Sequence, residues 1–315
     1  MKISGVMPIR NGQNWLPFKI DEIMMTLQNS DELIVIDDNS KDETLRLLLK
    51  LSRTYDNLTV LENPRQGIVS ALNFGIKQST NEIIFRYDID DQYVQGRKEL
   101  QLAEISKGSG LVFADYAIWG KGKTFLGVIP TAIRNDESSL SLLRARRTPH
   151  PIACFSKSLF DDVGGYSEED SPAEDHGLWI RMSKRTNISS VPNVLLNYNL
   201  NPHSVSFSNF SRIKEKTYEI NSSWKVDAEY KNGLLDSLAE YSEICAQTNF
   251  GDERLLLHYS DLLHPQFLSQ LSKNEQKFIK SLVKSKTFNF SNLKTGSRIS
   301  FEIAKRKIYR RLNSL

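Results

Sequence analysis

The chain has 315 residues, with 41 lysines and arginines against 38 aspartates and glutamates, so its net charge is only +3. This near balance argues against a protein that binds nucleic acid, because such proteins usually carry a strong basic excess. With 39% hydrophobic and 10% aromatic residues, the sequence predicts a folded core rather than a disordered chain. Its length accommodates one large domain or two modest ones.

Cysteine usage and hydropathy indicate the compartment. The two cysteines, Cys154 and Cys245, are too few for a disulfide framework or a zinc cluster, and they fit a reducing environment. The N-terminal residues enter a strand-like run at once and leave no room for a signal peptide. No apolar stretch is long enough to span a bilayer. We therefore expect a cytoplasmic protein, soluble or attached at the surface of a membrane.

The first half of the chain alternates between strand and helix patterns. The expected strands cover residues 2–9, 32–37, 58–62 and 82–87, and the expected helices cover 16–27, about 40–51 and 66–77. Ser40 and Glu43 form a capping-box pattern that is expected to open the second helix. This alternation predicts right-handed crossovers and a mostly parallel sheet with helices on both faces.

The second half is less regular. Residues 111–119 and 149–156 read as strands, residues 173–185 read as a helix, and the pattern after about residue 210 is mostly helical. We therefore expect an α/β domain over residues 1–210 and a helical C-terminal region over residues 211–315.

Three aspartates, Asp88, Asp90 and Asp91, crowd into four positions at the end of the fourth expected strand. Carboxylates this close repel one another, so they indicate either a solvated loop or a site for a hard cation. Asp37 and Asp38 lie at the end of the second strand, and ligands of parallel sheets bind outside such carboxyl ends. Two acidic strand ends on one edge favour the cation site.

Six segments occur in an order that points to a known family. They are VMPIRN, ELIVIDDNSKDET, PRQGIVSALNFGI, FRYDIDD followed by GR, HPIACFSKSLFDDVGGY and AEDHGLWIRM. Over roughly residues 1–206 this series resembles family 2 of the inverting glycosyltransferases, and especially bacterial enzymes that build capsule, O-antigen and other surface polysaccharides. The resemblance implies the GT-A fold, a Rossmann-like mixed, mostly parallel sheet flanked by helices, here with a mainly helical C-terminal extension.

The resemblance also implies a sugar donor and a metal. Asp88 and Asp90 match the family's metal motif, with Asp90 as the direct ligand of Mn²⁺ or Mg²⁺, Asp88 facing the ribose or ordering the site, and Asp91 in support. The ion would neutralise charge on the diphosphate leaving group. The implied partners are a nucleotide-sugar donor, a UDP-sugar being favoured, and a glycan or lipid-linked acceptor, with no nucleic acid.

Further donor-binding residues follow from the same match. Asp38 matches the position that contacts the uracil or ribose, although a turn aspartate is the alternative. Arg10 stands where the family often has an aromatic residue, which leaves the identity of the base open. The remaining predicted contacts are Pro8, Ile9, Arg65, Gly67, Asn73 and Arg86. For Gly67 and Asn73, helix packing is the competing interpretation.

The acidic pair Glu174–Asp175 opens a helix and matches the family's catalytic pair. Asp175 is then the base that takes the proton from the acceptor hydroxyl, and Glu174 binds or orients the acceptor. An ordinary acidic first turn is the alternative. Relatives commonly carry Arg and His where Asn199 and Asn201 stand here. His203, two positions later, could supply the diphosphate or metal contact, or it could be a loop histidine facing solvent.

Residues 298–312 alternate Ile and Leu with Lys and Arg, as in a basic amphipathic helix. Such a helix could lie on the inner face of the cytoplasmic membrane, or it could dock on the protein by its apolar side. Among rival functions, a nucleotidyltransferase or an NAD-dependent oxidoreductase would need a glycine-rich loop after the first strand, where only Gly12 occurs. A catalytically degenerate partner subunit that binds sugar nucleotides stays open.

Overall fold

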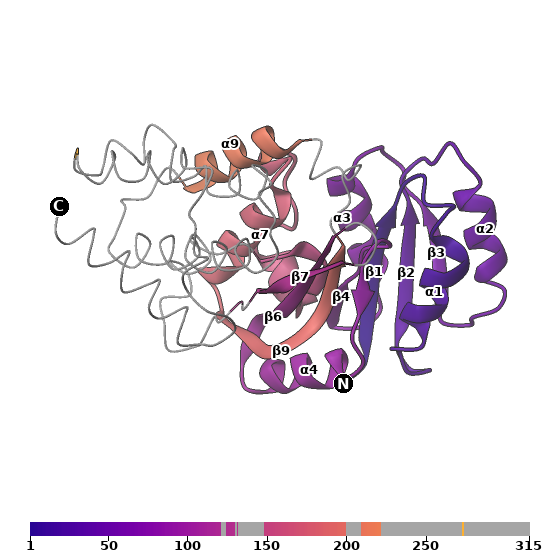
Figure 1. The fold of residues 1–315 in the computed structure, drawn as a ribbon, viewed down its shortest axis with the longest axis horizontal. Helices are drawn as coiled ribbons and strands as arrows, with labels where there is room; N and C mark the ends of the chain where they lie inside the picture. Colours follow the sequence, from indigo (N-terminus) through magenta and orange to yellow (C-terminus); the bar gives the residue numbers. More distant parts are fainter. Residues whose placement is uncertain (121–123, 130, 132–147, 200–208, 222–272, 274–315) are drawn as a thin grey trace.

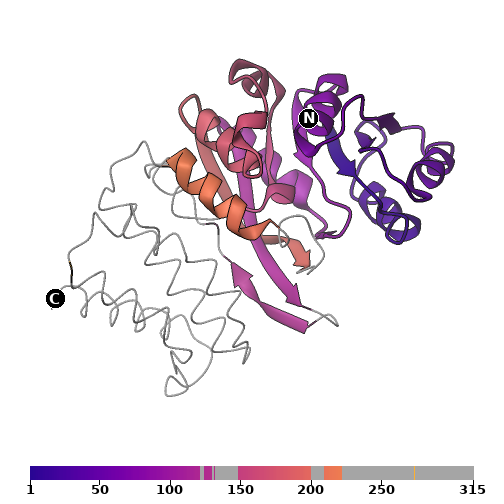
Figure 2. The ribbon, with the colours of Figure 1, turned by 90° about the horizontal axis from the view of Figure 1, so that it is seen from above.

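The computed structural model describes residues 1–120, 124–129, 131, 148–199, 209–221 and 273. The strands of this part form one sheet in the order β3-β2-β1-β4-β8-β6-β9-β5, with β7 paired to β6 (Figure 1). In Figure 1, α4 is drawn below the sheet and α7 above it. Figure 2 shows the N-terminal strands and helices grouped on one side and α9, in orange, on the other side of the described chain.

The first half is a parallel α/β unit. Strand β1 pairs with β2 on one side and with β4 on the other, and β2 pairs with β3, all in parallel. The strands are β1 (Ile3–Ile9), β2 (Glu32–Asp37), β3 (Leu58–Glu62) and β4 (Ile83–Arg86), and the helices are α1 (Leu16–Met24), α2 (Thr44–Leu51) and α3 (Ile68–Gln78). The near-continuous apolar runs of β1 and β2 follow from burial on both faces of the sheet.

The second half extends the sheet with mixed pairing. Strand β8 is antiparallel to β4 and β6, whereas β6 and β9 run parallel. The elements are β5 (Gln92–Tyr93), α4 (Arg97–Ser106), β6 (Ser109–Gly120), β7 (Thr124–Ile129), the 3₁₀ turn η2 (His150–Ile152), β8 (Cys154–Ser156), α6 (Lys157–Asp162), the 3₁₀ turn η3 (Glu168–Asp170), α7 (Glu174–Ser183), β9 (Asn187–Asn199) and α9 (Phe210–Asn221).

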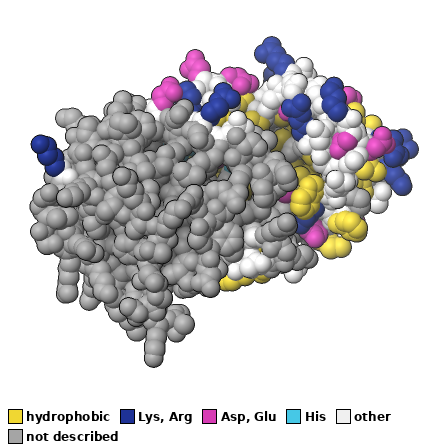
Figure 3. Space-filling view, turned by 45° about the horizontal axis from the view of Figure 1, so that its top comes forward, with side chains coloured by type: hydrophobic (Ala, Val, Ile, Leu, Met, Phe, Trp, Pro, Cys, Tyr) yellow, Lys and Arg dark blue, Asp and Glu magenta, His cyan; other side chains and the backbone are white. Residues whose placement is uncertain are grey.

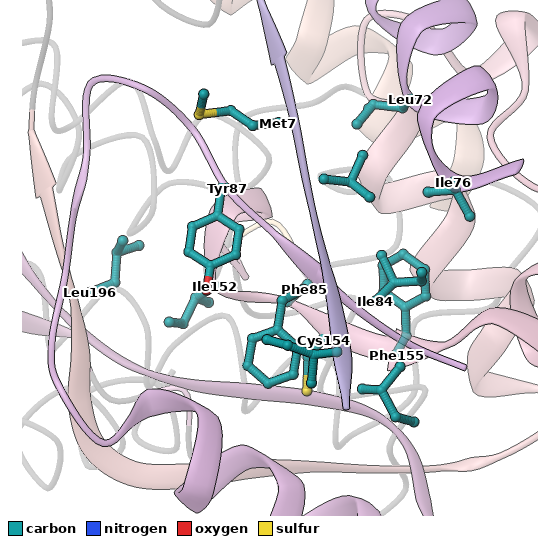
Figure 4. Close-up of a cluster of buried hydrophobic side chains, with 14 of the residues drawn as sticks. Met7, Leu72, Ile76, Ile84, Phe85, Tyr87, Ile152, Cys154, Phe155 and Leu196 are labelled. Carbon is teal, nitrogen blue, oxygen red and sulfur yellow. The ribbon is translucent and has the colours of Figure 1, made fainter. Parts of the chain in front are cut away.

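One hydrophobic core joins the two halves. Figure 4 shows side chains from β1, α3, β4, β8 and β9 in this core, with Phe85 beside Cys154. Trp179 of α7 is fully buried, and its ring lies 5.5 Å from that of Phe113 in β6 and 5.8 Å from that of Phe155 in β8. These ring contacts fix α7, and with it the acidic pair at its start, against the sheet.

Two local predictions were wrong. The second helix begins at Thr44 with Glu43 as its N-cap and no side-chain cap bond, so Ser40 and Glu43 do not form a capping box. The N–H of Ser40 instead donates to Asp37 Oδ2 at 3.1 Å, which makes a turn after β2. The strand expected over residues 149–156 is also shorter, because η2 occupies its first half.

Of the elements that escaped prediction, two did so for clear physical reasons. The 13-residue strand β9 contains Pro192, which indicates a break, but the register with β6 shifts between Val191 and Val194. Such a bulge removes the need for a proline N–H in the ladder. Helix α4 buries Arg97, Lys98 and Gln101 with only Leu102, so apolar periodicity could not reveal it.

The C-terminal predictions lie mostly outside the described residues. Helix α9 packs against α7, and apart from it only Lys273 is described after residue 210. The domain boundary at residue 210 therefore stays a prediction, as does the membrane helix over residues 298–312. Within the described part of the chain, no helix has the length and apolarity needed to cross a membrane.

A buried ion pair between Asp31 and Lys98 ties α4 to the start of β2. The Nζ–Oδ2 distance is 2.7 Å, and Asp31 also accepts the N–H of Ile3 at 3.0 Å. We expect Asp31→Ala to lower the free energy of unfolding by about 3–5 kcal/mol, because it leaves a buried ammonium without its partner. Glu104→Ala, which breaks an exposed pair with Lys107, should cost less than about 1 kcal/mol. Denaturant unfolding measures both, and equal losses would contradict this account.

Candidate active site

The carboxyl ends of β1, β2 and β4 meet at one edge of the sheet, because these strands are parallel neighbours. The chain runs outward from β1 to β2 and β3, then returns to β4 on the other side of β1. This reversal of strand order is the topological switch point where ligands of such sheets bind. It brings together the predicted residues Arg10, Asp38 and Asp88, each just beyond the end of its strand, and Pro8 and Ile9 at the end of β1.

Asp38 links the end of β2 to the start of α3. It is 7% exposed, and its Oδ1 accepts a hydrogen bond from Asn63 Nδ2 at 2.7 Å and from the N–H of Gly67 at 2.8 Å. Gly67 has φ +126°, a region that favours glycine, and it precedes the first residue of α3. Gly67 therefore contacts Asp38 through its backbone.

Two exposed arginines flank this turn. With the Gln66 amide oriented so that its oxygen faces Arg10, that oxygen accepts from both Nη atoms of Arg10 at 2.6 and 2.7 Å. Arg65 is exposed beside Gln66. Asp37, the last residue of β2, is 3% exposed, and its Oδ1 has no hydrogen-bond partner among the described residues. The edge thus carries two exposed cationic groups and a buried carboxylate.

Arg86, the last residue of β4, is fully buried and holds Asp88. Its Nη2 donates to Asp88 Oδ1 at 2.7 Å, and its Nη1 donates to the carbonyls of Val6, at 3.3 Å, and Tyr87. Burial opposes the charge of Arg86, but Asp88 together with Tyr166 and Tyr93 outweighs this effect, so the pKa of Arg86 is raised. The hydroxyl of Tyr93 accepts the N–H of Asp88 at 2.5 Å and fixes its backbone.

Asn199, at the end of β9, holds the rest of the acidic segment. Its N–H donates to Asp91 Oδ1 at 3.0 Å, and its Nδ2 donates to the carbonyl of Asp90 at 2.6 Å. Asp91 is 2% exposed, and its pKa is raised well above the usual range by burial and by the charges of Asp90 and Asp88. The cation of Arg86 and the N–H of Asn199 therefore offset part of the repulsion within the cluster.

The half-buried carboxylates of Asp88 and Asp90 fit a divalent ion in part. Mg²⁺ prefers oxygen ligands and often binds through one or two carboxylates together with substrate phosphates and water. Across the described ranges, no group of three or more His, Cys, Asp or Glu side chains is arranged to hold an ion. An ion at this edge would therefore take further oxygen ligands from a bound donor. His203 lies outside the described residues.

The acidic pair at the start of α7 has raised pKa values. Glu174 is 7% exposed, and burial together with the charge of Asp175 raises its pKa to about 7. Asp175 is half-buried, its Oδ1 accepts the N–H of His176 at 2.7 Å, and burial raises its pKa as well. Arg86 lowers both pKa values, and Asp88 raises that of Glu174. The pair thus lies within electrostatic range of the end of β4.

Asn73 has a different position from the other predicted donor residues. Its Nδ2 donates to the carbonyl of Tyr166 at 2.9 Å, and its Oδ1 accepts the N–H of Tyr166 at 3.0 Å. The amide therefore joins α3 to the loop between α6 and η3, which agrees with a packing role. Contact between Asn73 and a donor stays a prediction.

Sequence reasoning missed the tyrosines of the site. Tyr93 holds the backbone of Asp88, and Tyr166 contacts His150 at 2.7 Å. Their one signal was position: Tyr93 follows Asp91 by two residues, and Tyr166 follows a glycine pair. An aromatic side chain is so often core that this spacing alone does not identify a site residue.

The family comparison agrees with this geometry. Residues 4–161, which are 158 of the 315 residues, match the model of Glycosyl transferase family 2. The chain therefore belongs to this family, as the sequence predicted.

Three curated glycosyltransferases are similar to this chain at low sequence identity. An uncharacterized glycosyltransferase of Rickettsia bellii is 24% identical over 224 residues, which cover 70% of this chain and 32% of the relative. The GalNAc(5)-diNAcBac-PP-undecaprenol beta-1,3-glucosyltransferase of Campylobacter jejuni is 25% identical over 58% of this chain and 60% of the relative. The UDP-Gal:alpha-D-GlcNAc-diphosphoundecaprenol beta-1,3-galactosyltransferase of Escherichia coli is 28% identical over 55% of this chain and 64% of the relative. The chain thus spans about a third of the Rickettsia relative.

Solved structures confirm the fold prediction. S. aureus TarS 1–349 in complex with UDP-GlcNAc has a TM-score of 0.60 at 15% identity, and the match covers 98% of this chain and 92% of the TarS chain. Mannosyltransferase PcManGT from Pyrobaculum calidifontis, in complex with GDP-Man and Mn²⁺, has a TM-score of 0.59 at 15% identity, and the match covers 97% of this chain and 86% of the PcManGT chain. At this identity the likeness shows the GT-A fold alone.

The raised pKa of Glu174 predicts a pH-dependent stability. Between its ordinary value of 4.5 and about 7, the folded protein keeps a proton that the unfolded chain has released. Stability should therefore fall as pH rises through this window. We expect Glu174→Gln to be more stable than wild type by on the order of 1–3 kcal/mol at about pH 8, and nearly equal at about pH 4.

Denaturant midpoints measured across pH check this expectation. The exposed Glu169 of η3 offers the control, because Glu169→Gln makes the same chemical change without removing a buried carboxyl. A stability difference between wild type and Glu174→Gln that does not vary with pH would contradict the expectation.

Proposed function

We propose that the protein is an inverting glycosyltransferase that moves a sugar from a nucleotide-diphosphate donor, with a UDP-sugar favoured, to a hydroxyl of a glycan or lipid-linked acceptor. The observation that carries this proposal is the proximity of two acidic groups. Asp88 and Asp90 lie at the switch point of the sheet. Glu174 lies within electrostatic range of Asp88, and both Glu174 and Asp175 lie within range of Arg86, which holds Asp88. The first pair suits a charged donor, and the second suits proton transfer.

The nucleoside would bind at the ends of β1 and β2. Oδ1 of Asp38 is committed to Asn63 and Gly67, so contact with the uracil or ribose falls to Oδ2. Pro8 and Ile9 would line the base. The exposed guanidinium of Arg10 can stack on a base or pair with phosphate, and Arg65 can pair with phosphate.

Asp88 and Asp90 would hold Mn²⁺ or Mg²⁺ together with oxygens of the donor diphosphate, and His203 is proposed as a further contact to the metal. The bound ion would offset the negative charge that develops on the leaving diphosphate. Arg86 keeps Asp88 in place through the 2.7 Å contact at Nη2. Tyr93 and Asn199 hold the backbone of the same segment, so the carboxylates are presented by a fixed loop.

Asp175 is the proposed base. It is more exposed than Glu174, so an acceptor hydroxyl can reach it, and the α7 N-terminus stabilises its charge through the N–H of His176. The raised pKa values of the pair suit a base that works near neutral pH. Attack of the acceptor oxygen on the anomeric carbon, opposite the leaving diphosphate, would invert the configuration. Glu174 would orient the acceptor.

The acceptor class rests on relatives. The Campylobacter jejuni and Escherichia coli relatives are named for substrates linked to undecaprenol through a diphosphate. We infer a similar lipid-linked or glycan acceptor, and a role in capsule, O-antigen or lipopolysaccharide synthesis, for this chain. A cytoplasmic protein that touches the inner membrane surface through residues 298–312 would meet such an acceptor. Residues 1–210 would form the transferase domain.

A partner subunit that binds a sugar nucleotide without turnover is the second candidate. The observation that favours it is Asn199, which stands where relatives commonly carry Arg or His and which here bonds to Asp90 and Asp91. A transferase must turn over, whereas the partner subunit needs only to bind. The test therefore has to measure binding and turnover separately.

We expect Asp175→Asn to keep donor binding and to lose turnover by on the order of 10²–10⁴-fold, because only the base is removed. Asp90→Asn should instead weaken the Mn²⁺-dependent thermal shift caused by the nucleoside diphosphate. Thermal shifts with UDP, GDP, CDP and dTDP, with and without Mn²⁺, give the base preference. Release of the nucleoside diphosphate from the matching sugar donor gives turnover.

Lys50→Ala, an exposed change on α2 away from this edge, is the control and should behave as wild type. Full turnover by Asp175→Asn would remove the assignment of the base. Donor binding without turnover by the wild type would favour the partner-subunit candidate. A Mn²⁺-dependent shift that survives in Asp90→Asn would contradict the metal site.

A further inference from the structure

A series of buried and half-buried polar groups connects the donor edge to α7, the helix of the proposed base. Asp88 Oδ1 accepts from Arg86 Nη2 at 2.7 Å, and Arg86 Nε donates to His150 Nε2 at 3.3 Å. The same Nε2 lies 2.7 Å from the hydroxyl of Tyr166. Tyr166 is in turn close enough to Asp175 and Glu174 for their charges to raise its pKa, after the larger effect of burial. His150 is at the centre of this series of polar contacts.

The geometry fixes the protonation of His150. A guanidinium Nε–H can only donate, so the Nε2 atom that faces Arg86 must carry a lone pair. With the ring proton on Nδ1, the Tyr166 hydroxyl, 2.7 Å from Nε2, shares this single lone pair with the N–H of Arg86. Burial, and next the charge of Arg86, lower the pKa of His150 well below its usual range, which agrees with a neutral imidazole. A protonated ring here would direct an N–H at a cation.

Tyr166 is held at both its backbone and its hydroxyl. Asn73 of α3 clamps its N–H and carbonyl at 3.0 and 2.9 Å. Arg181 of α7 donates to the carbonyl of the preceding residue, Gly165, at 2.6 Å. The loop therefore has one fixed place between α3 and α7, and the His150 contact fixes the direction of the phenol ring.

We propose that His150 is a positioning residue whose neutral Nε2 acceptor sets the orientation of Arg86 toward Asp88 and of Tyr166 toward the Glu174–Asp175 pair. The inference deepens and rests on the proposed function, because it assigns to one side chain the alignment of the donor edge with the base. A role in packing alone would need only an aromatic ring, since the ring of His150 lies 5.5 Å from Tyr166 and 5.8 Å from Trp179.

Two substitutions distinguish a role of His150 as hydrogen-bond acceptor from a role of its ring in packing. His150→Phe keeps a ring against Trp179 but leaves the Nε–H of Arg86 and the hydroxyl of Tyr166 without their acceptor. His150→Gln loses the ring but places an amide oxygen near the former Nε2. If positioning is the role, kcat falls by on the order of 10- to 100-fold in His150→Phe and is largely restored in His150→Gln. If packing is the role, the order of the two variants is reversed.

A third variant tests the Tyr166 end of this series of polar contacts. Tyr166→Phe removes one hydroxyl and leaves the Arg86–His150 contact in place. We expect it to lower kcat while the Kd of the nucleoside diphosphate with Mn²⁺ stays at the wild-type value. His150→Phe should change both kcat and Kd, because it also frees Arg86. Calorimetric titration and initial rates, measured well below the Tm of each variant, give this split. Unchanged kcat in both variants would overturn the proposal.

Side-chain ¹⁵N NMR tests the hydrogen-bond centre apart from turnover. The His150 signals, assigned by their loss in His150→Gln, should show an unprotonated Nε2 and a protonated Nδ1 near neutral pH. Tyr166→Phe should shift the Nε2 signal. A protonated Nε2 would overturn the proposal even if the enzyme is active. A wild type that binds and turns over no donor would instead count against the proposed function, and the NMR result would still decide the role of His150 as acceptor.

Discussion

The site depends on one buried cation at the end of β4. Asp88, Asp90 and Asp91 lie together, and their mutual repulsion would open this edge of the sheet without compensation. Arg86 supplies that compensation from below, fully buried and 2.7 Å from Asp88. A guanidinium suits this place, because its planar group of donors can bind a carboxylate and two backbone carbonyls at once. A buried lysine would offer a charge without that geometry.

The fold explains why a second acidic group lies within reach of this cation. Strand β8 pairs with β4 on the side away from β1, and α7 packs on β6 and β8 through Trp179. The start of α7 is therefore directed toward the end of β4. The order of strands therefore brings α7 near β4, while the loop after β4 carries Asp88 and Asp90.

The sequence predicted what local patterns encode. Strand β2 was predicted at its exact bounds, because a run buried on both faces has a clear apolar signature. Helix α4 and strand β9 escaped, since the first buries Arg97 and Gln101 and the second hides Pro192 in a bulge. The acidic residues proposed for the site, and Arg86 beside them, were predicted by motif and spacing. The support from Asn199 could not be, because Asn199 contacts Asp90 across 109 positions of sequence.

Similar carboxyl groups acquire different properties from their surroundings. Asp88 keeps a permanent cation within hydrogen-bond distance, as a group that must stay charged for a diphosphate-bound ion would require. Glu174 is desolvated beside Asp175, and its pKa rises to about 7; burial also raises the pKa of Asp175, the proposed base. Arg86 acts directly on the first group and only through space on the second. Because one guanidinium serves both, a change that moves Arg86 would disturb charge at the donor edge and proton transfer at α7 together.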